Sequence, residues 1–256
     1  MSEIKQYIEK SREIIEKIAA QEERIEQAAL LFAKTILSGR MVHVFGSGHS
    51  RIMVEEMWPR YGSFPGFNPI VELSLTFHNL VVGANGQRQA MFLENVSGLA
   101  ERILRNYQLS TEDSALVISS SGTNIVPVEI AELFQQKGIK VVSIITKSHS
   151  EASKSKRSDG KKLSDFSDIV LDTCAPAGDA MIQIENLETP VSPGSTLGGV
   201  VLINSIKAKV ASLLTKAGQP PTVLSAANKV GEQQAIALFE KAYDEHASRL
   251  SKLYQF

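Results

Sequence analysis

The stretch that most constrains the fold is residues 115–124, where an apolar run passes directly into small hydroxyl side chains. Ala115 to Ile118 has the character of a buried strand, and residues 125–137 have helical spacing. Between them lies Ser119-Ser120-Ser121-Gly122-Thr123-Asn124. The first turn of a helix leaves backbone N–H groups unpaired and favours negative charge, so this loop predicts an anion site. Because Ser, Thr and Asn are also ordinary N-caps, the loop alone is equally compatible with a plain turn.

A second loop of the same kind strengthens the first interpretation. Residues 41–45 are predicted as a strand, and Gly46-Ser47-Gly48-His49-Ser50 leads from it into a helical segment at 50–58. The loop is not a dinucleotide fingerprint, because Arg51 stands where the third glycine belongs, and no Gly-Lys-Ser/Thr follows to make a P-loop. Two such loops face a shared crevice when their strands are neighbours in a parallel sheet.

Strand and helix signals alternate along the chain, which predicts a parallel sheet covered by helices on both faces. Residues 4–37 have the spacing of one long amphipathic helix, and residues 230–253 predict a last helix. The polar, basic segment 147–167 predicts a solvated loop, or alternatively a flap that offers cations to a ligand. Further strands are expected at 69–74, 115–119, 140–146 and 168–171, and further helices at 93–106, 125–137 and 195–217.

The paired loops resemble those of the SIS (sugar isomerase) domain, a family that binds phosphosugars. Residues 119–124 are similar to its Ser-x-Ser-Gly-x-Thr/Ser phosphate loop, and residues 46–50 to its Gly-x-Gly-x-Ser turn. The resemblance extends over roughly residues 1–250, and it is closest to the single-domain phosphosugar-binding branch and more distant to phosphoheptose isomerases. It implies a three-layer α/β/α sandwich with a five-stranded parallel sheet in the order 2-1-3-4-5 and helical extensions at both ends.

On this interpretation residues 1–256 form a single SIS domain. Residues 1–39 supply an N-terminal helix, residues 40–218 the α/β core and residues 219–256 a C-terminal extension. A phosphate is expected on the loop after the third strand, and the sugar toward the first loop. The predicted binding residues are Gly46, Ser47, Gly48, Ser50, Ser119, Ser120, Ser121, Gly122, Thr123, Asn124, Ser195 and Thr196, of which the last two are expected as N-caps that also touch substrate.

Three residues are candidates for acid–base chemistry, which interconversion of an aldose and a ketose phosphate requires. Glu56, in Glu56-Met57-Trp58-Pro59-Arg60-Tyr61, resembles the Glu-x-x-x-Arg-Phe segment of phosphoheptose isomerases, whose glutamate is catalytic. Its spacing from Ser50 is about one helical turn shorter than in that family. Glu188 precedes Ser195-Thr196, as the base does in glucosamine-phosphate synthase isomerase domains. His49 could act as an acid near neutral pH. Solvent-exposed helix or loop positions are the alternatives for both glutamates.

The remaining histidines predict no catalytic cluster. His43 alternates with apolar neighbours inside a strand and is expected to be packed, His78 is interpreted as structural, and His149 could approach a ligand. No spacing among the five histidines and Cys174 predicts a metal site, and no cofactor is expected.

Charge and composition exclude several classes of partner. The net charge of −1 gives no basic surplus for nucleic acid or an anionic membrane surface. The apolar runs are strand-sized, so no membrane span is expected. A single cysteine is typical of a reducing cytoplasm. The long N-terminal helix favours a homodimer or homotetramer.

The sequence therefore predicts a cytoplasmic protein that binds a phosphorylated sugar. Its expected reaction is aldose–ketose isomerisation through an enediol, and the resemblance adds amino or N-acetyl sugar phosphates as substrates. A non-catalytic phosphosugar sensor, a sugar-phosphate lyase or etherase on the same fold, and a purely structural oligomer are the alternatives.

Overall fold

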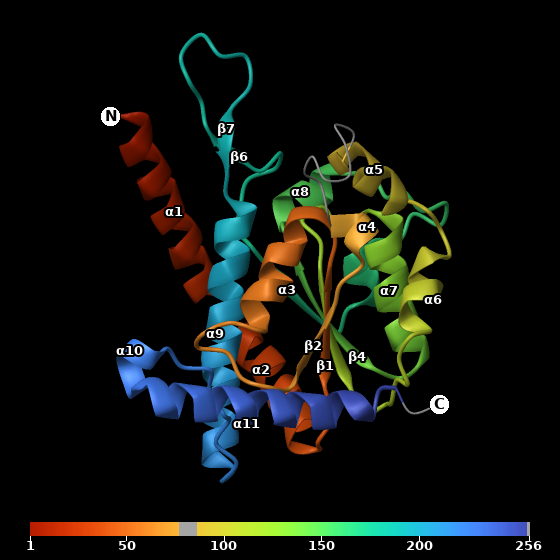
Figure 1. Ribbon diagram of the computed structural model, residues 1–256. Helices are drawn as coiled ribbons and strands as arrows, with labels where there is room; N and C mark the ends of the chain where they lie inside the picture. Colours follow the sequence, from red (N-terminus) through yellow and green to blue (C-terminus); the bar gives the residue numbers. More distant parts are fainter. Residues whose placement is uncertain (77–85, 255–256) are drawn as a thin grey trace.

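Five parallel strands form the centre of the molecule. The structure is a computed structural model that describes residues 1–76 and 86–254. The sheet has the order β2-β1-β3-β4-β5, as the resemblance implies, and β1 lies directly beside β3. Figure 1 shows the sheet between its helices. Each strand runs parallel to its neighbours, and the bounds are β1 (Val42–Gly46), β2 (Phe67–Ile70), β3 (Ser114–Ile118), β4 (Lys140–Ile145) and β5 (Ile169–Asp172).

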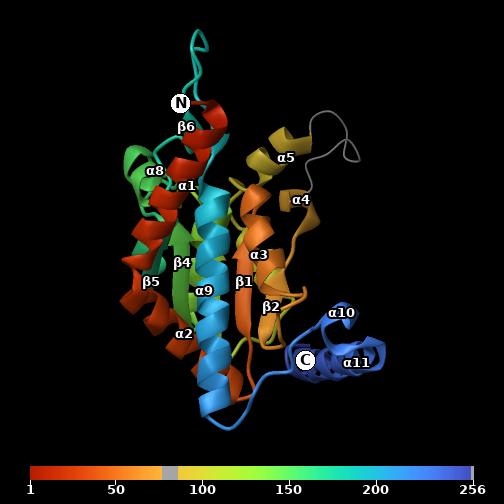
Figure 2. The same ribbon diagram turned by 90° about the vertical axis from the view of Figure 1, so that its left-hand side faces the viewer.

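Helices cover both faces of the sheet and make a three-layer α/β/α sandwich. Alternate strand residues enter different cores: Leu116 and Ile118 pack with one layer, while Ala115 and Val117 pack with the other. Both faces of the central strands are therefore buried, which explains their continuous apolar sequence. The first layer contains α2 (Glu22–Leu37), α3 (Arg51–Met57) and α9 (Ser195–Lys216), and the second contains α6 (Leu99–Leu104) and α7 (Ile125–Gln136) (Figure 2).

The N-terminal segment is two helices, so the expectation of one long helix was wrong. α1 (Glu3–Ala19) ends before Gln21, and α2 begins at Glu22. The Gln21 side chain binds the exposed backbone of the edge strand β5: Nε2 donates to Asp172 O at 2.8 Å, and Oε1 accepts from Asp172 N at 2.9 Å. A tertiary contact with the edge strand therefore accompanies a break that the helical spacing does not signal.

Several other boundaries differ from the sequence-based expectations. The strand expected at 69–74 lies at 67–70. Within the helix expected at 93–106, α5 ends at Leu93 and α6 begins only at Leu99, after Gly98, whose φ is +85°. Segment 147–167 is ordered rather than a free loop, since Lys156 N donates to Thr123 O and Leu163 N to Gly122 O. His78 lies outside the described residues. The other elements are α4 (Leu73–Thr76), α5 (Gly86–Leu93), α8 (Lys147–Ala152), η3 (Leu163–Phe166), β6 (Ala180–Ile182), β7 (Val191–Pro193), α10 (Ala227–Val230) and α11 (Glu232–Ser251).

Helix α9 is long and apolar enough to cross a membrane, by length and composition alone. From the sequence, only apolar runs of the length of a strand were expected. The most apolar 18-residue window of α9 has a mean hydropathy of 1.5. In the folded chain α9 packs against α1, α2 and α3. Leu202, Ile203 and Ile206 are fully buried there. This packing is that of a core helix.

Candidate functional site

A cavity of about 630 Å³ opens at the carboxyl ends of the central strands. Both hydroxyl-rich loops contribute to it, because β1 and β3 are neighbours and end side by side. This is the switch point at which parallel α/β sheets bind ligands. Of the predicted binding residues, those that line the cavity are Ser47, Gly48, Ser50, Ser119, Ser120, Ser121, Asn124, Ser195 and Thr196, together with His49.

The first loop is held by a short turn that only glycine permits. Residues Gly48–Ser50 form a 3₁₀ turn, η1, and Ser50 N donates to Ser47 O at 3.1 Å. A Cβ on Gly46 would lie 2.7 Å from Ser50 O, so the buried Gly46 supports the loop from behind. Gly48 has a φ of +56°. The loop thus presents Ser47 and Ser50 to the cavity at fixed positions.

The second loop curls tightly and leaves backbone donors available. Gly122, with a φ of +62°, donates its N–H to Ser119 Oγ at 3.2 Å, and Thr123 Oγ1 donates to Ser121 Oγ at 2.9 Å. The backbone N–H groups of Ser120, Ser121, Asn124 and Ile125 donate to no acceptor in the described part of the chain. Asn124 is the N-cap of α7 without a side-chain cap bond. These donors suit an anion.

Glu94 connects the two loops and was not identified from the sequence. Its carboxylate accepts from Ser47 Oγ in the first loop and from Asn124 Nδ2 in the second, each at 2.7 Å. Its backbone carbonyl accepts from Val126 N at 2.9 Å. Burial raises the pKa of the Glu94 carboxyl above its ordinary value, although the hydrogen bonds from Ser47 and Asn124 and the charge of Lys156 act in the opposite direction.

The far wall of the cavity carries a second carboxylate and a histidine. Asp179 has a φ of +69° and accepts from the N–H groups of Gly194 and Ser195, which begin α9. Gly194 is therefore the N-cap, and the expectation that Ser195 and Thr196 are N-caps was wrong. Ser195 instead donates its hydroxyl to Asp179 Oδ2 at 2.7 Å. His149 Nδ1 accepts from Gly178 N at 2.9 Å, which fixes the ring against this wall.

The two glutamates predicted as bases do not line this cavity. Glu56 faces α9 and Arg60: its carboxylate accepts from Asn204 Nδ2 at 2.8 Å and pairs with Arg60. Burial alone would raise the pKa of Glu56, but the hydrogen bonds from Asn204 and Arg60 outweigh it and lower the pKa. Glu188 is exposed in the loop that joins β6 to β7. Three of the predicted binding residues do not line the cavity either, and they support the two loops from behind: Gly46, Gly122 and Thr123.

Weak sequence signals exist for both of the cavity carboxylates. Glu94 directly follows the last turn of α5. A negative charge is unfavourable at a helix C-terminus, so a glutamate at this position indicates a role other than helix stabilisation. Asp179 follows Gly178 in a sequence typical of turns. Among residues 1–76 and 86–254, no group of three His, Cys, Asp or Glu side chains could hold a metal ion.

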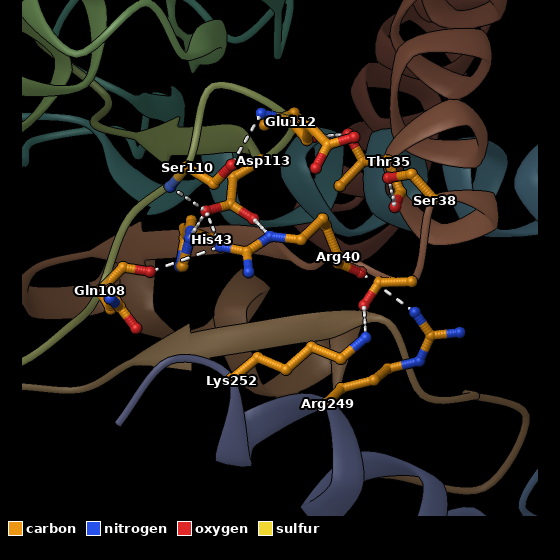
Figure 3. A network of polar contacts seen from close by, with 12 residues as sticks. Thr35, Ser38, Arg40, His43, Gln108, Ser110, Glu112, Asp113, Arg249 and Lys252 are labelled. Carbon is orange, nitrogen blue, oxygen red and sulfur yellow. Dashed lines mark hydrogen bonds and ion pairs between the residues drawn. The ribbon is translucent and has the colours of Figure 1, made fainter. Parts of the chain in front are cut away.

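A charged cluster lies at the amino ends of β1 and β3, whereas this cavity lies at their carboxyl ends. Figure 3 shows the polar contacts of the cluster. His43, fully buried in β1 as its alternation predicted, has Nε2 3.3 Å from Asp113 Oδ2. Arg40 binds both oxygens of Asp113, at 2.8 and 2.9 Å. Burial would raise the pKa of Asp113, but the bonds from His43 and Arg40 outweigh it and lower the pKa to about 2. This is a structural ion pair that joins the starts of β1 and β3.

Comparisons with known proteins agree with this architecture. A family model described as "SIS domain" matches residues 6–146. A UPF0309 protein of Thermoanaerobacter pseudethanolicus is 34% identical over 242 residues, which are 92% of this chain and 96% of the relative. A UPF0309 protein of Listeria innocua is 31% identical over 244 residues, 94% of this chain and 96% of the relative.

Two solved structures share the fold. A phosphoheptose isomerase from Neisseria gonorrhoeae superposes with a TM-score of 0.50 and 14% identity, over 82% of this chain and 97% of that chain. A phosphoheptose isomerase from Francisella tularensis gives a TM-score of 0.51 and 16% identity, over 82% and 96%. At these identities the likeness shows the arrangement of elements alone.

Proposed function

Because the chain belongs to the SIS domain family, we propose that the cavity between its two hydroxyl-rich loops binds a phosphorylated sugar. The phosphate is placed on Ser119, Ser121 and Asn124 at the start of α7. The four unpaired backbone N–H groups of this loop support that placement, since a phosphate accepts from such groups. No lysine or arginine lines the cavity within the described residues, so hydroxyls and amides carry the recognition.

The proposed reaction is aldose–ketose isomerisation with Glu94 as the base. The base removes a proton from the carbon beside the carbonyl while the carbonyl oxygen takes up a proton from water, which gives an enediol. The same group then returns its proton to the former carbonyl carbon, and the other hydroxyl releases its proton to water. The observation that carries this proposal is the position of Glu94, which touches the sugar-side loop through Ser47 and the phosphate-side loop through Asn124. Its raised pKa favours proton transfer near neutral pH. His49 and His149 line the same cavity and are the candidate acids for ring opening.

A thermal-shift screen tests the binding step. Wild-type protein is measured against sugar phosphates, including amino and N-acetyl sugar phosphates, and against the corresponding free sugars. A ligand that binds only the folded state raises the unfolding midpoint. We expect a rise with a phosphosugar and none with its free sugar. The Ser119→Ala/Ser121→Ala double variant should fold but lose that rise. An unchanged rise in the double variant would remove the phosphate-loop assignment.

The proposal extends to assembly and location. Helix α1 exposes Ile4, Ile8 and Ile15, and an apolar helix face of this kind suits a contact between copies in a homodimer or homotetramer. Light scattering at micromolar concentration would measure the oligomeric mass, and a monomer would contradict this part. The single thiol and the proposed metabolite ligand both favour the cytoplasm.

A further inference from the structure

A second cavity lies behind the wall of the first. Its volume is about 680 Å³, and we refer to it as the α1 cavity because α1 forms one side of it. The beginning of α8 and the segment that follows β5 form the other side. Figure 2 shows α1 running beside β6. The two cavities have no lining residue in common.

Positive charge predominates in the α1 cavity. Lys10, Lys17, Arg24 and Lys147 line it, against two carboxylates. Both carboxylates already have partners: Glu13 lies 3.3 Å from Lys10 Nζ, and Asp172 Oδ1 accepts from Lys147 N and Cys174 N at 2.9 Å each. Of the cations, Lys147 Nζ lies 4.0 Å from Glu151 and Arg24 Nη1 donates to Val170 O at 3.5 Å. Lys17 Nζ forms no hydrogen bond or ion pair within the described residues. The Lys17 ammonium is therefore available to a ligand.

The inner surface of the same cavity is apolar. Pro176 is exposed and Ala180 and Met181 are half-buried there, above the buried Ile14 and Ala175. A small inorganic anion would leave these side chains uncovered, whereas an organic anion would cover them while its charged group meets the cations. A cavity of this volume accommodates a molecule of the size of a nucleotide or smaller.

We propose that the α1 cavity binds a small organic anion, with a phosphate or carboxylate group at Lys17, Arg24 and Lys147 and an apolar part on Pro176 and Met181. This site is separate from the proposed phosphosugar site. Neighbouring residues face opposite ways across the shared wall: Thr173 and His149 line the first cavity, while Cys174 and Ser148 line the second. Ser148 Oγ donates to Ala175 O at 2.8 Å, which holds the wall together.

Phenyl phosphate is a suitable probe because it joins a dianion to an apolar ring, and inorganic phosphate and phenol each supply one half. Titration calorimetry is performed on the Ser119→Ala/Ser121→Ala variant, so that the phosphate loop does not contribute. We expect phenyl phosphate to bind more tightly than either control. Lys17→Met should weaken it about tenfold, since a charge-assisted contact is lost. Lys5→Met, which removes the same charge from α1 outside the cavity, should leave binding unchanged.

A second readout locates the probe. Cys174 is the single cysteine of the chain and lines the α1 cavity, so bound phenyl phosphate should slow its alkylation by iodoacetamide. The proposal is overturned by any of four results: no binding at millimolar concentration, binding that disappears with the Ser119/Ser121 changes, equal weakening by Lys17→Met and Lys5→Met, or unprotected Cys174. Equal affinity for inorganic phosphate would overturn the apolar half of the assignment.

Discussion

Glu94 is the residue on which the proposed chemistry depends. We expect Glu94→Gln to retain phosphosugar binding and to lower turnover by about 10² to 10⁴-fold, the usual contribution of a general base. The free energy of unfolding, unlike the turnover, should not decrease. Burial raises the pKa of Glu94, so its ionised form disfavours the folded state at neutral pH, and the amide removes that unfavourable contribution. Urea unfolding at pH 7 should therefore show a variant at least as stable as the wild type.

Glu56→Gln is the matched control for this prediction. Glu56 contacts Asn204 and Arg60 on the side of α3 that faces α9, and we expect its amide variant to keep turnover close to that of the wild type. Loss of turnover in Glu56→Gln, with activity retained in Glu94→Gln, would restore the assignment suggested by the phosphoheptose isomerase segment and exclude Glu94 as the base.

Asp113 links stability to pH at the other end of the sheet. Its pKa is lowered to about 2 from an unfolded value of 3.8, so its stabilising effect is complete above about pH 4. The effect is lost as the pH falls through about 2. Asp113→Asn should cost at least about 2 kcal/mol at pH 7, and this difference should shrink toward pH 2. Urea unfolding across this range measures it, and a pH-independent difference would contradict the assignment.

Some residues of the cavity could be predicted from the sequence and others could not. That Ser119, Ser121 and Asn124 line the cavity was predictable from the local sequence pattern, because they lie between one strand and one helix. Glu94 was not, because its partners Ser47 and Asn124 are far from it along the chain and meet only after β1 and β3 pair. His43 could be recognised as packed from strand alternation, but its contact with Asp113 depends on the same strand pairing.

At the scale of elements, the central strands were predictable and the interruptions were not. Apolar runs between turn signals locate β1, β3, β4 and β5 within one residue at either end. The break at Gln21 accompanies contact with an edge strand, and the β6–β7 hairpin is too short to leave a periodic signal. The spacing of apolar residues reveals elements that bury a continuous face. The break at Gln21 and the β6–β7 hairpin depend on tertiary contacts instead.

The close approach of α9 to the end of β5 leads to a prediction at this scale. A Cβ on Gly198 would lie 2.1 Å from Thr173 O, a backbone atom in the cavity wall, whereas a Cβ on Gly199 would meet the flexible Met53 side chain at 2.9 Å. Both changes to alanine gain helix propensity of about 1 kcal/mol. We expect Gly199→Ala to be nearly neutral, and Gly198→Ala to destabilise by about 2 kcal/mol or more. Thermal unfolding compares them, and equal midpoints would contradict this packing.

In the whole molecule, the proposed binding sites and the C-terminal helix α11 lie at opposite ends of the sheet. The cavities open at the carboxyl ends of the strands, while α11 crosses the amino ends (Figure 1). Arg249 of α11 donates to Ile36 O and Arg40 O, and Lys252 to Gly39 O, which satisfies carbonyls at the end of α2 (Figure 3). A C-terminal extension was predictable from the sequence, but its attachment was not, because these carbonyls belong to the backbone.

This separation predicts that α11 supports stability without taking part in binding. Trp58, the single tryptophan, is 1% exposed and packs against Tyr243 and His246 of α11, with ring centroids 5.6 and 5.2 Å away. A chain ending at Ser225 keeps Leu224, which pairs with Gly62 and Ser63, but uncovers Trp58. We expect its fluorescence to shift to longer wavelength and its unfolding midpoint to fall, while phosphosugar affinity stays within about threefold. Full-length Arg249→Ala should lose stability with Trp58 still covered. A shortened chain that unfolds cooperatively yet no longer binds would mean that α11 acts on the cavity through the sheet.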